Sequence, residues 1–493
     1  MNSSSHQETD IVVIGGGPGG STVATLTAKF GHRVLLLERE EFPRYQIGES
    51  LLPSTVHGIG RLLGISDRLR AAGFTRKNGG TFRWGSNPEP WTFSFAISPR
   101  FAGPNSFAYQ VERMKFDQIL LDNARECGVD VREKCTVVDV LHDGERVSGV
   151  SYVDGEGRKH TVDAGFVVDA SGNKTRTSKH VGERRYSEFF RNLALFGYFE
   201  GGRRLPPPNS GNILSAAFDD GWFWYIPLTE TLTSVGAVVQ RGAHEKVQGD
   251  PEQALRNLID ACPLIKDYLK DATRVTDGPY GELRVRKDYS YCNTEFWKPG
   301  MVLIGDAACF VDPVFSSGVH LATYSALLAA RSLNSVKAGT VGEAEAMGEF
   351  ERRYRREYGV FYEFLVSFYG MHVDEHSYFW KAKDITEHPL SEFEAFVELV
   401  GGAASGESQL LSPEATAENL VGGSRSLATA AGRLWEEPGA LHGTAVVANA
   451  MTESARLQAA ALLGVDGAES VPLFADGLIA SADGTQWIRP DEY

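Results

Sequence analysis

The sequence predicts an α/β fold in which a Rossmann-like domain is combined with a mixed β-sheet domain and a helical C-terminal region. Residues 11–38 show a buried apolar strand, a glycine-rich turn, a helix and a second apolar strand, which is the pattern of a βαβ unit. Residues 190–290 read as β-strands rich in aromatic side chains. Residues 345–400 have a helical pattern and also carry many aromatic residues.

The Rossmann-like domain is expected to be discontinuous. A helix that begins near Phe116 is followed by short alternating strands and by a buried strand at 166–168. A strand, a turn and a long helix return at 300–333. Beyond about residue 401 a composition rich in Ala, Gly, Ser and Glu predicts loose order. The expected parts are a nucleotide-binding domain at 8–185 and 285–335, a β-sheet domain at 186–284, and a helical region at 336–493.

Composition excludes several classes of function. The formal net charge of −15 argues against a nucleic-acid partner, because binding to phosphates needs clustered positive charge. The chain has no unbroken apolar run of the ~18 residues that a membrane span requires. The stretch MNSSSHQETD lacks the features of an export signal, so a cytoplasmic location is expected. Five cysteines without metal-binding spacing predict neither a disulfide framework nor a metal site.

The turn GGGPGG satisfies G-x-G-x-x-G through Gly15, Gly17 and Gly20. Glycines at these positions let the backbone turn tightly and approach a diphosphate at a helix N-terminus, where free amides and the helix dipole favour negative charge. Glu38 ends the next strand, where a carboxylate accepts hydrogen bonds from ribose hydroxyls. The βαβ unit therefore predicts a dinucleotide cofactor.

Two later segments, DASG at 169–172 and GDAACFVDP at 305–313, resemble the distal flavin motifs of glutathione-reductase-type FAD monooxygenases. The resemblance implies FAD, with Asp306 near its ribityl and diphosphate groups. The resemblance also implies that Arg44 and Arg113 lie close to the cofactor. The alternative, a solvated position on the surface, stays open for either arginine. The expected FAD-binding residues are Gly15, Gly17, Pro18, Gly20, Glu38, Arg39, Arg44, Ser50, Arg113, Asp169, Gly305 and Asp306.

The segment GWFWYIP matches the W-x-W-x-I-P signature of flavin-dependent halogenases, and the resemblance covers roughly residues 8–400. It implies a bulky apolar wall that keeps the organic substrate away from the flavin. Trp222, Trp224, Ile226 and Pro227 stand at the signature positions. The alternative is a core strand with packed aromatics, as in an ordinary hydroxylase.

The same resemblance implies that reduced FAD, oxygen and bound chloride yield hypochlorous acid, which travels to Lys77 in FTRKNGG. Burial would lower the pKa of this lysine and make a neutral amine accessible for chlorination, whereas a surface lysine would be the ordinary alternative. The halide is expected at the amides of Ser317 and Gly318, where a helix begins. Tryptophan halogenases have a glutamate two residues before the position of Ser317, but this chain has Phe315.

The missing carboxylate favours an electron-rich phenolic or pyrrolic substrate over free tryptophan. The substrate is expected either as a small aromatic molecule or tethered to an acyl or peptidyl carrier protein, for which ERRYRREY offers arginines. A separate NADH-dependent flavin reductase is expected, since no second glycine-rich βαβ unit is found. We therefore predict an FADH2-dependent halogenase, a chlorinating oxidoreductase of secondary-metabolite or antibiotic biosynthesis. An aromatic hydroxylase or a geranylgeranyl-reductase-like enzyme is the alternative.

Overall fold

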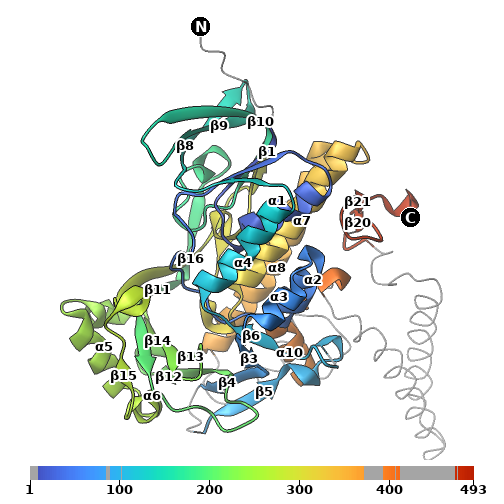
Figure 1. Ribbon diagram of the computed structural model, residues 1–493. Coiled ribbons are helices and arrows are strands. Elements are labelled where there is room, and N and C mark those ends of the chain that lie inside the picture. Colours follow the sequence, from blue (N-terminus) through green and yellow to red (C-terminus); the bar gives the residue numbers. More distant parts are fainter. Residues whose placement is uncertain are drawn as a thin grey trace, which may run out of the picture.

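The computed structural model describes residues 9–84, 89–101, 103–370, 392–405, 407–410, 472–474 and 476–492 (Figure 1). Two large sheets form the frame, and long helices lie beside the first of them. No helix within these described ranges is both long and apolar enough to cross a membrane.

The first sheet contains the predicted βαβ unit. Its central strands pair in parallel and are buried, which is why they read as continuous apolar runs. Helix α1 (Pro18–Lys29) packs against α7 (Gly318–Ala338) and α4 (Arg113–Glu126). The order along the sheet is β17 (Trp297–Lys298), β18 (Met301–Leu303), β10 (Lys159–Asp169), β1 (Thr9–Ile14), β2 (Val34–Leu37) and β7 (Asp130–Arg132), with β8 (Thr136–Asp143) and β9 (Arg146–Val153) attached to β10.

The second sheet is mixed, and helices α5 (Pro251–Asp260) and α6 (Pro263–Leu269) cover its outer face with a separate apolar cluster. The opposite face joins the main core of the molecule. The order along this sheet is β19 (Cys309–Phe310), β16 (Arg284–Asn293), β11 (Arg184–Glu200), β14 (Leu232–Val239), β13 (Gly221–Pro227), β12 (Ile213–Phe218), β4 (Gly79–Arg83) and β5 (Trp91–Ser94), with β15 (Thr273–Arg274) on β11.

The sheets do not follow the division expected from the sequence. Strand β16 pairs with β11, so the boundary drawn at residue 285 falls inside a strand of the second sheet. Strands β4 and β5 also belong to this sheet, because β4 pairs in parallel with β12 far along the chain. Local patterns cannot show such pairing, since they carry no information on long-range partners.

Short elements between the sheets complete the frame. Strand β3 (Thr75–Lys77) pairs with β6 (Ala108–Gln110) next to a π-helix at Ser54–Ile59. The remaining helices are α2 (Gly60–Leu63), α3 (Ser66–Ala71), α8 (Glu343–Gly370) and α10 (Glu392–Gly401).

The C-terminal part of the chain is only partly within the described residues. Part of the segment predicted to be helical, 371–391, and most of the segment predicted to be loosely ordered, 411–471, lie outside them. The described parts of the first segment are helical, in α8 and α10. Where residues beyond 401 are described, loose order is wrong. Arg331 of α7 forms a buried two-pronged ion pair with Glu407 at 2.6 and 2.9 Å. The Trp487 side chain of β21 (Trp487–Ile488), which pairs with β20 (Ile479–Ala480), is fully buried.

Candidate active site

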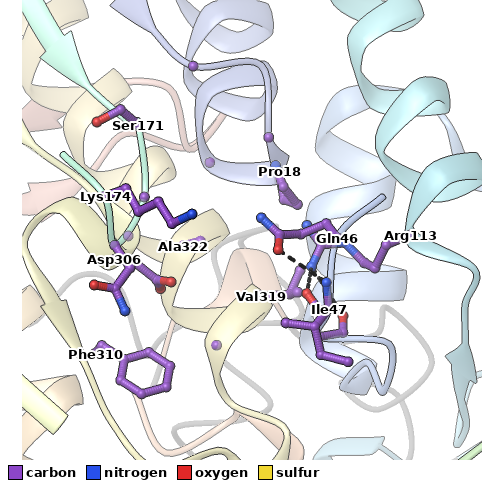
Figure 2. Close-up of a pocket in the computed structure, with 18 of the residues that line it drawn as sticks. Pro18, Gln46, Ile47, Arg113, Ser171, Lys174, Asp306, Phe310, Val319 and Ala322 are labelled. Atoms are coloured by element: carbon purple, nitrogen blue, oxygen red, sulfur yellow. Dashed lines mark hydrogen bonds between the residues drawn. The ribbon is translucent and has the colours of Figure 1, made fainter. Parts of the chain in front are cut away.

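A deep cavity opens where β1 and β10 end, and the glycine-rich turn forms one wall (Figure 2). Gly15 has φ +101°, and a Cβ atom on Gly20 would lie 1.9 Å from the Gly15 carbonyl oxygen. Only glycine fits both positions. Pro18 is the first residue of α1, whose N-cap Gly17 has no side chain to satisfy the first amides. These amides are left to bind a diphosphate.

Glu38 fixes this turn as well as facing the cavity. Its Oε2 accepts a hydrogen bond of 2.6 Å from the Gly16 amide, and its Oε1 accepts one of 2.8 Å from the Glu40 amide. Arg39 also lines the cavity and pairs with Glu40 at 3.4 Å. The end of β2 is therefore rigid at the place where a ribose is expected.

Arg44 and Arg113 share one buried partner, Asp117 of α4. Arg44 Nη1 lies 2.7 Å from its Oδ2, and Arg113 donates to both carboxylate oxygens at 2.7 and 2.8 Å. Arg113 also donates to the Ile47 carbonyl at 2.6 Å, and thereby holds the loop before Ser50 (Figure 2). Both arginines line the cavity, and the alternative of solvated surface arginines is wrong.

Sequence reasoning missed Asp117. Its position four residues after Arg113 on one helix was the available signal, because residues at that spacing share a helix face.

Asp169 acts through its loop. Its carboxylate is fully buried and accepts hydrogen bonds from Ser171, Thr175 and Thr177 at 2.5–2.9 Å. Asp169 itself is not part of the cavity wall in the described chain, but the loop presents Ser171 and Lys174 to it (Figure 2). The expected direct role in FAD binding becomes a role in shaping the loop.

Asp306 points its carboxylate towards the middle of the cavity (Figure 2). Burial raises its pKa to about 6, although Arg286, Arg113 and Arg184 oppose this shift. Gly305 precedes it with φ +56°, where a side chain would be strained. Asp306 thus stands at the position where the motif places a ribityl contact.

Strand alternation explains the aromatic segment at 221–227. Trp222, Trp224 and Ile226 point to the cavity and line it, whereas Phe223 and Tyr225 pack under α5 and α6. Pro227, at the end of the strand, is not among the lining residues that the structure describes. A second aromatic layer backs the wall, since the rings of Trp84 and Trp222 are 6.2 Å apart.

The turn before α7 combines free amides with an orphaned hydroxyl. Ser316 adopts a left-handed conformation with φ +61°, and Ser316 and Gly318 line the cavity. Ser317 is fully buried, and its Oγ has no hydrogen-bond partner among the described residues. Buried hydroxyls are normally bonded, so an unpaired one beside a helix N-terminus fits an anion.

Lys77 lies behind Ser50 as seen from the cavity. Its side chain is buried, with a relative exposure of 2 %, so the alternative of a surface lysine is wrong. The amine donates to Ser50 Oγ at 2.8 Å and to the Leu51 carbonyl at 3.0 Å, and it lies 5.6 Å from the centre of the Phe95 ring. Burial lowers the pKa of Lys77 to about 7.

Phe315 is buried in an aromatic cluster next to Lys77. Its ring lies 4.8 Å from that of Phe368 and 5.9 Å from that of Phe82. The cluster reaches the lysine through Phe93 and Phe95, whose rings are 5.5 Å apart. A carboxylate at this position would lie among these aromatic rings.

Among the described residues, no group of three or more His, Cys, Asp or Glu side chains could hold a metal ion.

The fold and the cavity define a flavoprotein that resembles solved FAD-dependent halogenases. The family described as "Tryptophan halogenase" matches residues 10–103 and 98–438. "Tryptophan 2-halogenase" of Chondromyces crocatus is 36% identical over 390 residues, 78% of this chain and 72% of that protein. The myxobacterial chondrochloren halogenase CndH is 53% identical with a TM-score of 0.75, covering 97% of this chain and 99% of that one.

A second solved structure, CmlS, a flavin-dependent halogenase, is 37% identical with a TM-score of 0.68, covering 76% of this chain and 67% of that one. The chain belongs to the tryptophan-halogenase family and is a flavin-dependent halogenase. Its cavity fits FAD, because Gly17 and Pro18 line it at the N-terminus of α1, where no side chain caps the first amides and a diphosphate can bind. The prediction of halogenase activity and of FAD is confirmed at the level of the family.

Proposed function

We propose that this enzyme chlorinates an electron-rich aromatic substrate, phenolic or pyrrolic, with FADH2, oxygen and chloride. The observation that supports this proposal most directly is the position of the buried Lys77 amine. It donates a hydrogen bond to Ser50, and Ser50 lines the FAD cavity. FAD, when bound, supplies the reducing equivalents with which oxygen is activated. The residues of the chain hold the halide, exclude the organic substrate from the flavin and direct the halogen to Lys77.

The chloride would lie at Ser317 and Gly318. The orphaned Ser317 hydroxyl supports this, because it offers a donor that no group in the described chain uses. The N-terminus of the 21-residue helix α7 adds favourable potential for an anion.

The wall formed by Trp222, Trp224 and Ile226 would keep the substrate from the flavin ring. These three side chains occupy one face of β13. The Trp224 indole nitrogen donates to Ser234 at 3.2 Å, and the Trp222 indole nitrogen has no partner among the described residues. Only a small oxidant such as hypochlorous acid would pass.

At Lys77 the oxidant would be held as a chloramine or by hydrogen bonds. A pKa of about 7 keeps a substantial fraction of the amine neutral at physiological pH, which a chloramine requires. Phe315 in place of a carboxylate leaves the proton of the ring to another acceptor, which supports a phenolic or pyrrolic substrate over free tryptophan.

A free small aromatic molecule is the better supported form of the substrate. Three of the four arginines in ERRYRREY that could have docked an acidic carrier protein are engaged within the chain, whereas Arg356 is exposed. Arg352 pairs with Glu349 and Asp476, Arg353 with Glu349, and Arg355 with Glu351. FADH2 would come from a separate NADH-dependent flavin reductase, and a role in secondary-metabolite or antibiotic biosynthesis fits this chemistry.

The test is a product analysis. The protein, FADH2, oxygen and chloride are incubated with a panel of free phenols, pyrroles and tryptophan, and with the same acyl groups on a carrier protein. Masses that increase by one chlorine for phenols or pyrroles support the proposal. Hydroxylated product that forms without halide would support the aromatic hydroxylase instead.

The matched variant is Lys77→Ala. Loss of chlorinated product with unchanged FAD affinity is expected, because the lysine lies outside the cavity wall and acts after the oxidant has formed. Chlorination at the wild-type rate in this variant would refute the role of Lys77.

A further inference from the structure

A continuous chain of hydrogen bonds runs from the loop surface to the FAD cavity. The Tyr45 and Tyr198 hydroxyls lie 2.7 Å apart, and the Tyr198 hydroxyl donates to Glu49 Oε1 at 2.7 Å. Glu49 lines the cavity immediately before Ser50, the partner of the Lys77 amine. Three groups that can exchange protons are thus connected without a gap.

Burial increases along this chain. Tyr45 is half-buried, whereas Tyr198 is fully buried and Glu49 has a relative exposure of 2 %. The Tyr45 ring is anchored from outside by the Arg284 guanidinium, 3.7 Å from its centre. Tyr45 is therefore the partly exposed end of the path, and Glu49 is the buried end beside the cavity.

Atom balance requires such a connection if the proposed function holds. The overall reaction converts an aryl C–H bond, chloride, O2 and FADH2 into an aryl C–Cl bond, FAD and two water molecules. FADH2 gives two electrons and chloride gives two, which together reduce O2. Four hydrogens leave in water but the substrate and FADH2 supply only three, so each turnover takes up one proton. A closed cavity needs a route for it.

We propose that Tyr45, Tyr198 and Glu49 form this route, with Glu49 delivering the proton into the cavity and regaining it through the two tyrosine hydroxyls. The carboxyl O–H bond of Glu49 breaks as the proton passes to an acceptor in the cavity. Tyr198 then gives its proton to Glu49 and takes one from Tyr45, which is resupplied by solvent. The role of this route in the reaction rests on the proposed function, whereas its hydrogen bonds are independent of that function.

The surrounding charges allow Glu49 to carry a proton near neutral pH. Burial raises the pKa of its carboxyl to about 7. Hydrogen bonds from Ser234 and Tyr198 and the charge of Arg113 act against this, and Glu112 adds to it. At the outer end, burial raises the pKa of Tyr45 to about 12, while Arg284 and Arg286 oppose the change. Tyr280 packs 4.5 Å from the Tyr198 ring and donates to Glu112 rather than into the chain. The tyrosines stay neutral and pass protons by exchange.

The kinetic experiment mixes FADH2-loaded protein with oxygen, chloride and substrate, and follows proton uptake with a pH indicator alongside product. Tyr198→Phe should slow both by about 100-fold, the lower end of what proton transfer by a positioned group contributes. It should also enlarge the solvent deuterium isotope effect. Tyr45→Phe breaks the chain at its half-buried end and should act in the same direction, which keeps the test valid should Tyr198→Phe fail to fold.

A second measurement uses protein without flavin. Infrared titration should show a carboxyl band with a midpoint near pH 7 that disappears in Glu49→Gln. Tyr198→Phe should move this midpoint upwards, because the lost hydrogen bond stabilised the carboxylate. This measurement needs no halogenated product, so it judges the route even if the proposed function fails.

The matched control is Tyr152→Phe. Tyr152 is also a buried tyrosine with a hydrogen-bonded hydroxyl, which accepts from Arg132 at 3.0 Å, but it lies on β9 outside the cavity wall. It should change neither the rates nor the titration. Wild-type rates and an unshifted midpoint in Tyr198→Phe would overturn the route while leaving the proposed function intact.

Discussion

The amine of Lys77 donates a hydrogen bond of 2.8 Å to the hydroxyl of Ser50, and only one of these two residues lines the FAD cavity. Ser50 faces the cavity and Lys77 faces the aromatic cluster around Phe95. The contact links the cavity to this aromatic cluster, and several measurable consequences follow from it.

Burial of Lys77 should cost stability at neutral pH. Its pKa is about 7 in the folded protein against 10.5 when exposed, so the unfolded chain binds more protons between these values and stability falls as pH decreases from about 10 to about 7. Lys77→Met should therefore raise the free energy of unfolding by on the order of a few kcal/mol at pH 7. Urea unfolding from pH 6 to 10 should show this gain constant below about pH 7 and shrinking above it. A gain that grows with pH would contradict the depressed pKa.

Asp117→Asn should weaken FAD binding. The substitution leaves Arg44 and Arg113 buried without their shared carboxylate, which costs about 3–5 kcal/mol where such a charge loses its partner. The loop before Ser50 should loosen, and FAD affinity should fall at least tenfold in a fluorescence titration. Asp122→Asn, a half-exposed aspartate of the same helix, is the control and should change neither property. Equal FAD affinity in both variants would mean that Asp117 does not position the cavity.

Ser317→Ala should raise the chloride concentration needed for half-maximal chlorination, by roughly tenfold for one lost hydrogen bond to a charged group. Stability should stay the same or rise slightly, since the buried hydroxyl has no partner among the described residues. Ser335→Ala, in the same helix but with its hydroxyl bonded to the Arg331 carbonyl at 2.9 Å, should show the reverse pattern of lower stability and unchanged chloride dependence. Identical chloride dependence of Ser317→Ala and wild type would place the halide elsewhere.

Phe315→Glu should not create a tryptophan halogenase. The new carboxylate would be buried among the rings of Phe82, Phe364 and Phe368, and burial of a polar group that no hydrogen bond compensates costs about 2–7 kcal/mol. A lower urea midpoint and no chlorotryptophan are expected. Phe315→Leu keeps the apolar surroundings and should lose less stability. A stable Phe315→Glu variant that chlorinates tryptophan would show that this single position selects the substrate.

The sequence by itself determined the elements whose signals are local. The glycine turn at 15–20 and the carboxylate of Glu38 were readable because tight turns and helix N-termini need particular residues at fixed spacing. Alternation along a strand is a local rule of the same kind, and it puts Trp222 and Trp224 on one face. The motif at Ser317 indicated a helix start for the same local reason.

Only the tertiary structure decided how these parts meet. Contacts between distant segments place β16 and β4 in the second sheet and bring Arg44 to Asp117, the partner of Arg113. Such contacts also show that Asp169 holds its loop in shape. Whether Lys77 is a surface or a buried lysine could not be read from its neighbours, because a pKa is set by the three-dimensional surroundings. The path from Tyr45 through Tyr198 to Glu49 likewise joins a loop to a strand far along the chain. Its two hydrogen bonds of 2.7 Å form only when the loop and the strand are brought together by folding.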